Sequence, residues 1–110
     1  MAEDRLKLIL EGTGFPVAYR AFTPYKNNPV PKPPFVVYLY PRELHSGSDS
    51  KNFLRKRSVR VELYTLKKDT AAERKIEAAL CGFEFEKEET FIDSEALYQV
   101  SYEFDIYEKI

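Results

Sequence analysis

The sequence predicts an α+β domain with a mainly antiparallel sheet of about five strands and two helices on one face, in the order α-β-β-β-α-β-β. Three observations lead to this prediction. Two segments place apolar residues at helical spacing, and several others alternate apolar and polar residues as half-buried strands do. No strand–helix–strand repeat with a glycine-rich turn is present, which disfavours a parallel α/β sheet. At 110 residues, the chain fits a single domain spanning residues 1–110.

The first helix is predicted over residues 3–11. Leu6, Ile9 and Leu10 fall at positions i, i+3 and i+4 and form one apolar stripe. Two glycines follow within the next three residues, and glycine is common just past the end of a helix. We therefore expect a short helix with one apolar side.

The first strand is predicted over residues 15–23, which alternate in polarity, and Pro16 restricts its start to an edge position. Residues 24–34 are rich in proline, which fixes φ and lacks an N–H, so they predict an extended connector. The second strand is predicted over residues 35–40 and is ended by Pro41. Its apolar residues fall on both faces, which indicates a central position in the sheet.

A polar loop is predicted over residues 42–52, where Ser, Gly, Asp and Asn gather. The third strand follows, runs to about position 65, and is clearest from Ser58 onward. There Val59, Val61 and Leu63 alternate with polar or amphipathic neighbours, which is the pattern of a half-buried strand.

The second helix is predicted to begin near Thr70. Thr70 and Glu73 are spaced as in a capping box, in which the hydroxyl and the carboxylate bond to free backbone N–H groups, and Asp69 is the competing cap. Gly82 ends the helix. One helical face suited to packing on a sheet is formed by Ala72, Ile76, Ala79 and Leu80.

Residues 83–92 and 96–107 predict a closing hairpin. In its first strand Glu84, Glu86 and Glu88 are spaced by two and share one face, which predicts a surface that meets solvent or a partner. In its second strand one face is formed by Tyr98, Val100, Tyr102, Phe104 and Ile106.

The sequence holds no pattern of catalytic or metal-binding residues. His45 is the single histidine and lies in the predicted loop, where we expect an exposed side chain rather than part of a triad or metal site. Cys81 is expected to be a small buried thiol without reactivity, because no basic residue lies close to it in sequence. No P-loop, GxSxG, HExxH or EF-hand loop is present. We therefore expect no enzyme activity, no cofactor and no catalytic, metal-binding or cofactor-binding residues.

Composition narrows the class of protein further. The 17 basic and 18 acidic residues give a formal net charge of −1, which disfavours a uniformly basic nucleic-acid-binding domain. A single cysteine excludes an internal disulfide and indicates a reducing compartment. The longest apolar run is far shorter than a membrane span needs, and the charged N-terminus does not predict a signal peptide. We expect a cytosolic protein with no membrane partner.

The charges are segregated along the chain. Residues 51–60 contain five basic residues and no acid, whereas residues 84–95 contain six acids and one lysine. Either the two stretches are solvated or paired within one chain, or they lie on opposite sides of the domain and join one copy to the next in a heterologous contact. A third alternative is that the basic stretch contacts nucleic-acid phosphates. The residues predicted to form a subunit or partner interface are Lys51, Arg55, Lys56, Arg57, Arg60, Glu84, Glu86, Glu88 and Glu89.

Five stretches, in this order and spacing, resemble the tail-completion or tail-terminator proteins of long-tailed phages and prophages of Gram-positive bacteria. They are GFPVAYRAF (14–22), FVVYLYPR (35–42), RVELYTLKKD (60–69), AAERKIEAAL (71–80) and SEALYQVSYEF (94–104). The resemblance covers roughly residues 9–107, and none of the stretches is a catalytic signature. Residues 45–58 do not match the family pattern position by position, so the interface residues in that stretch are inferred from charge alone.

The resemblance implies a non-enzymatic structural protein of the virion tail or neck, present in the bacterial host cytoplasm during assembly. Such proteins form rings of identical subunits, commonly hexamers, that cap the tail tube and present a surface to the head-side connector. The expected partners are therefore further copies of the chain, the tail-tube protein, the head-side connector protein and, transiently, DNA passing through the ring. The alternatives are another neck component, such as a head-closure or head–tail joining protein, or a small phage-encoded nucleic-acid-binding or regulatory module.

Overall fold

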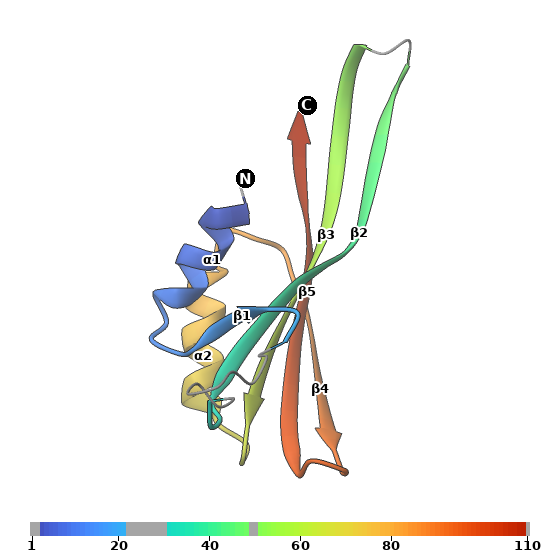
Figure 1. Ribbon diagram of the computed structural model, residues 1–110. Coiled ribbons are helices and arrows are strands. Elements are labelled where there is room, and N and C mark those ends of the chain that lie inside the picture. Colours follow the sequence, from blue (N-terminus) through green and yellow to red (C-terminus); the bar gives the residue numbers. More distant parts are fainter. Residues whose placement is uncertain (1–2, 22–30, 49–50, 110) are drawn as a thin grey trace, which may run out of the picture.

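Two short helices lie against one side of a five-stranded sheet in the computed structural model, which describes residues 3–21, 31–48 and 51–109 (Figure 1). The strand order is β1-β2-β3-β5-β4, and all neighbours are antiparallel except β1 and β2. The predicted α+β class and element order are confirmed. The elements are α1 (Glu3–Glu11), β1 (Val17–Tyr19), β2 (Phe35–Ser48), β3 (Lys51–Thr65), α2 (Thr70–Ala79), β4 (Glu86–Ile92) and β5 (Leu97–Lys109).

The core lies between the helices and the sheet. Leu6 and Leu10 of α1, Ile76 of α2 and the adjoining Leu80 are fully buried, as the helical spacing predicted. The alternation in β3 and β5 also sends the predicted residues inward, because successive side chains of a strand point to opposite faces. The sheet contributes Val36, Tyr38, Val59, Val61, Leu63, Val100, Tyr102, Phe104 and Ile106 to this core.

The central strands are much longer than the helices that cover them. The 15 residues of β3 extend about 50 Å, whereas the 10 residues of α2 extend about 15 Å. Three strands therefore continue beyond the helical layer as a projection, which we call the arm (Figure 1). The arm comprises residues 42–48 of β2, 51–58 of β3 and 107–109 of β5. It explains why the radius of gyration is 15.6 Å rather than the ~13 Å expected for a compact domain of this length.

The prediction of a polar loop over residues 42–52 is wrong, because most of this stretch belongs to β2 and β3. Pro41 does not end β2. Leu39 lies opposite Arg60 and Arg42 lies opposite Ser58, so two residues of β2 face one residue of β3 in a β-bulge. A bulge leaves a residue outside the hydrogen-bonded ladder and so tolerates proline, which has no N–H to donate.

The first strand is shorter than predicted and pairs in an unexpected direction. β1 covers three residues, and Val17 lies opposite Val36 in a parallel pairing, although its predicted edge position is confirmed. Residues 22–30, which include the end of the predicted strand and most of the predicted proline connector, lie outside the described part of the chain.

Two local predictions around α2 are wrong. Asp69, the competing cap, is the N-cap, since its Oδ1 accepts a hydrogen bond of 3.0 Å from the backbone N–H of Ala72. Thr70 is instead the first helical residue. Cys81 is exposed rather than buried, because α2 ends at Ala79 and the turn that follows directs Leu80 inward and Cys81 outward.

A matched pair of leucines on α1 tests the predicted packing. Leu10→Ala is expected to lower the free energy of unfolding by about 2–5 kcal/mol, because it empties a fully buried site. Leu8→Ala, at a position that is 66% exposed on the same helix, should change it by less than about 0.5 kcal/mol. Chemical denaturation of both variants measures the difference. Equal losses would show that α1 does not dock through this stripe.

Candidate functional site

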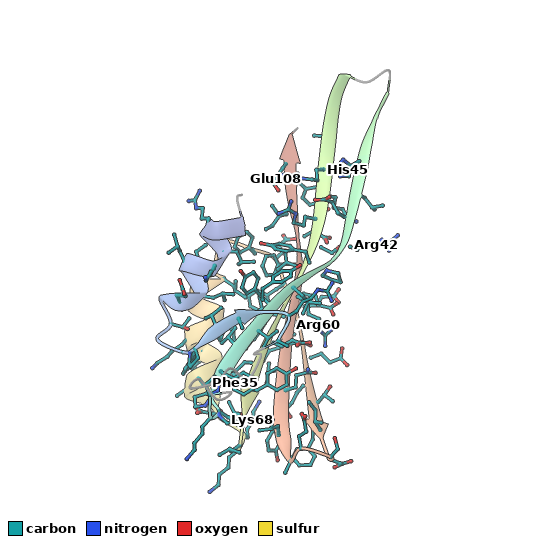
Figure 2. All side chains as sticks on the ribbon, viewed as in Figure 1. Phe35, Arg42, His45, Arg60, Lys68 and Glu108 are labelled. Carbon is teal, nitrogen blue, oxygen red and sulfur yellow. The ribbon has the colours of Figure 1, made fainter. Side chains whose placement is uncertain are left out.

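One carboxylate organises the charges on the helix side of the arm. Glu43 Oε1 lies 3.1 Å from Arg57 Nε, 3.1 Å from Arg57 Nη2 and 3.6 Å from Arg55 Nε. Its Oε2 lies 3.1 Å from Nε2 of His45, which is exposed as predicted but belongs to β2. Arg55 also reaches across the sheet, and its Nη2 lies 3.2 Å from Glu108 Oε2 of β5. These contacts join all three strands of the arm, and His45 and Glu108 mark their level in Figure 2.

These contacts stabilise the charged forms of the residues involved. The hydrogen bond with His45 does most to lower the pKa of Glu43; partial burial opposes this, and Arg57 and Arg55 reinforce it. Arg57 is only 8% exposed, and its guanidinium lies 4.8 Å from the ring centre of Tyr40, in cation–π contact. The arm is thus stabilised by ion pairs and ring contact in place of an apolar core.

A second polar network lies on the side of the sheet away from the helices, which we call the open side. Arg60 lies between two carboxylates, donating to Glu62 Oε2 at 2.7 Å and to Glu103. Tyr64 donates to Glu62 Oε1 at 2.9 Å and accepts from Gln99 Nε2 at 2.8 Å. Burial raises the pKa of Tyr64 to about 12. Figure 2 shows Arg60 and Arg42 on this open side.

A third network joins α2 to the edge strand β4. Glu73 is 2% exposed and lies 2.7 Å from both Lys68 Nζ and Lys87 Nζ. Lys87 also contacts Glu77 Oε2 at 2.8 Å, and this oxygen accepts a 2.9 Å hydrogen bond from the Tyr102 hydroxyl. Burial opposes ionisation of Glu73, but the hydrogen bonds from the two lysines outweigh it and lower the pKa of the carboxyl. The network therefore fixes the edge strand to the helical layer.

The structure separates the predicted interface residues into two groups. Four of them form ion pairs within the chain, but with partners outside the opposite predicted stretch; these are Arg55, Arg57, Arg60 and Glu89, the last with Lys68. The described residues supply no ion pair to Lys56, Glu84, Glu86 or Glu88. The side chain of Lys51 lies outside the described part of the chain.

The two charged stretches do not lie on opposite sides of the domain. Alternation along β3 sends Arg55 and Arg57 to the helix side and Lys56 to the open side. The same alternation along β4 sends Glu86 and Glu88 to the open side. Lys56 and the acids Glu86 and Glu88, to which the described residues supply no ion pair, therefore share one side of the sheet.

Sequence reasoning missed an apolar surface on the open side of the arm. Leu44, Lys56 and Tyr107 lie opposite one another on β2, β3 and β5, and Leu54 is the next residue along β3 on the same side. Tyr107 is 70% exposed, Leu54 52% and Leu44 43%. We call these four residues the arm face. Its sequence signal, isolated leucines within a polar stretch, is too weak to identify a strand without the pairing partner.

An open depression of about 540 Å³ lies beside the arm face on the same side of the sheet. Arg42 forms one wall, and four carboxylates line it, from Glu84, Glu86, Glu103 and Asp105. Glu103 is paired with Arg60, and Asp105 accepts a 3.1 Å hydrogen bond from Ser58. The described residues therefore provide no ion pair to the other three carboxylates, and those of Glu84 and Glu86 also receive no hydrogen bond from a described side chain.

The described residues include no cluster of three or more His, Cys, Asp or Glu side chains placed to hold a metal ion. Neither of the helices seen in the described ranges is long and apolar enough to cross a membrane. The exposed polar and apolar groups described above gather on the arm and on the open side of the sheet.

No protein-family model matches this sequence, and no curated protein matches it either. The resemblance to tail-terminator proteins accordingly depends on the five stretches given above.

The ion-pair network of Glu73 predicts a pH dependence of stability. A carboxyl whose pKa is lowered by folding stabilises the protein above its unfolded pKa, and this contribution is lost as the pH falls through the folded pKa. Glu73→Gln should therefore lower the free energy of unfolding at neutral pH by about 1–3 kcal/mol and make its decline on acidification shallower. Denaturation curves of both proteins across the acidic range measure this. Parallel pH profiles would contradict the assignment.

The carboxylate of Glu43 is predicted to hold the strands of the arm together. Glu43→Ala leaves two arginines side by side without their shared acid, so amide hydrogen exchange within residues 42–48 and 54–58 should accelerate, while exchange in the core strands stays unchanged. The matched control is Glu95→Ala, in the exposed β4–β5 turn. Unaltered exchange of the arm in the Glu43 variant would show that the strand ladder alone holds it.

Proposed function

We propose that this chain is a non-enzymatic structural protein of a phage virion, a tail terminator that acts as a ring of identical subunits. In this role it caps the tail tube, prevents further addition of tube protein and contributes to the head–tail interface. The five sequence stretches support the family, and the α+β fold agrees with what the resemblance implies.

The observation that carries the proposal is the arm. It extends beyond the helical layer, so the core of its own subunit does not stabilise it. Large apolar side chains are nevertheless exposed on its open side, and clustered exposed apolar groups are typical of protein-interaction sites. On its helix side the charged groups form ion pairs within the chain. An extension with paired charges on one side and exposed apolar groups on the other suits a subunit that is completed by its neighbours in an assembly.

The proposal assigns the partners by surface. The arm face has the apolar area to dock on a neighbouring subunit or on the tail-tube protein. The open side, with its paired Arg60 network and exposed acids, supplies a polar surface for the head-side connector. Binding of this kind needs no cofactor and no catalytic group, which agrees with the absence of catalytic motifs in the sequence.

Purified tail-tube protein from the phage or prophage that encodes this chain provides the direct test. Tubes polymerised in the presence of the chain are expected to stop lengthening and to carry a ring at one end, seen by electron microscopy. Tubes polymerised alone are the control and should continue to grow. Unaltered tube length with no density at the tube ends would overturn the proposal. Binding to the head-side connector but not to the tube would instead identify a head-closure component.

A further inference from the structure

We infer that the free chain forms a two-fold dimer in which the arm face of each copy docks on the acidic depression of the other. This inference goes beyond the ring proposed above and does not depend on it. It follows from three features of the open side of the sheet: an apolar surface around one cation, a depression with excess carboxylates, and their position on the same side.

The arm face has the composition of a docking surface. Leu44, Leu54 and Tyr107 are three of the seven large apolar side chains exposed among the described residues, and they surround Lys56 on three adjacent strands. Residues directly opposite on neighbouring strands have Cβ atoms about 5 Å apart, so the four side chains form one continuous patch. Lys56 has no acid partner among the described residues, so a complementary surface has to supply both apolar contact and negative charge.

The acidic depression offers that complement. Glu84 and Glu86 line it without an ion pair from any described residue. The neighbouring Glu88 also receives no ion pair from a described residue. Glu86 also lies directly opposite Glu103 across β4 and β5, and like charges so placed are destabilising. A lysine brought to this site relieves that repulsion. The aliphatic parts of the arm face have Pro41 to contact, since this residue lines the depression.

The position of the two surfaces determines the symmetry of the contact. Lys56 is level with Tyr107, and Glu86 is level with Glu103, which places the surfaces about 13 Å apart along β5 on the same side of the sheet. Two surfaces that point the same way come face to face only when one copy is turned by about 180°. A two-fold axis midway between them exchanges them, so each contact forms twice and the assembly closes at two copies.

The dimer covers the surface that the proposed assembly needs. While two free chains shield each other's arm faces, this exposed apolar patch is unavailable for premature or disordered association. Contact with a tail tube that binds the arm face more tightly would separate the dimer by mass action.

The experiment measures association of the full chain and of charge-reversed variants by sedimentation equilibrium. The wild type is expected to be a dimer whose dissociation constant increases when ionic strength rises from ~0.1 M to ~1 M, since the Debye length shortens from about 10 Å to about 3 Å. Lys56→Glu and Glu86→Lys should each weaken the dimer by about tenfold or more. Lys67→Glu, at an exposed lysine outside both surfaces, is the matched control and should leave it unchanged.

Mixing the two interface variants tests the reciprocal contact. In the mixed dimer one contact is native and the other has its charges exchanged, so the Lys56→Glu and Glu86→Lys chains should associate with each other far better than with themselves. Tyr107→Ser should weaken the dimer and Leu66→Ser, also exposed but distant, should not. Circular dichroism of each variant establishes that the fold is retained.

The outcomes separate this inference from the proposed function. A wild-type monomer at both ionic strengths, or a dimer equally sensitive to Lys56→Glu and Lys67→Glu, overturns the dimer and leaves the capping of tail tubes unaffected. A hexamer in place of the dimer overturns the two-fold contact but favours the ring. A dimer with the expected sensitivities, formed by a chain that does not act on tail tubes, supports the inference while removing the proposed function.

Discussion

The helices can bury only part of the sheet, and most features of this molecule follow from that difference in length. Where α1 and α2 cover the strands, the inward-facing positions are apolar and a core forms between the two layers. Where the strands continue alone, burial against a helix is no longer available as a source of stability. There the sequence changes to charged residues that pair across strands, and the arm depends on its backbone ladder and on the carboxylate of Glu43.

Strand periodicity redistributes charges that are clustered in the sequence. Neighbouring basic residues of β3 point to opposite sides of the sheet, and each side offers them different acids. Arg57 meets Glu43 of β2, and Arg60 meets Glu103 of β5, so neither uses the acidic stretch at residues 84–95. A cluster of charged residues along a strand is therefore divided between the two sides of the sheet. Only the members left without partners define a surface able to attract another molecule.

The sequence was a good guide wherever apolar residues recur with a period. Leu6 and Leu10 of α1 and the alternation of β5 predicted the core, because burial imposes that pattern on helices and half-buried strands. The arm was not predictable in this way, since both of its sides lie outside the core and its composition resembles that of a loop. Exposure of Cys81 and capping by Asp69 depend on the local path of the backbone at the two ends of α2. A shift of one residue in such a turn changes which side chain is buried or caps the helix. The candidate surfaces were recognised only in part: Lys56, Glu84, Glu86 and Glu88 were among the predicted residues, whereas Leu44, Leu54 and Tyr107 required the register of three strands.

The β-bulge that includes Pro41 changes which side of the sheet successive residues of β2 face. Before it, even-numbered residues such as Tyr38 face the helices; after it, odd-numbered residues such as Glu43 do so. A single extra residue thus places Glu43 against the arginines of β3 and leaves Leu44 on the open side opposite Lys56. Deleting one amino acid at this point would exchange the sides of these two β2 residues while β3 and β5 kept theirs, so the helix side of the arm would lose its shared carboxylate and the open side one leucine.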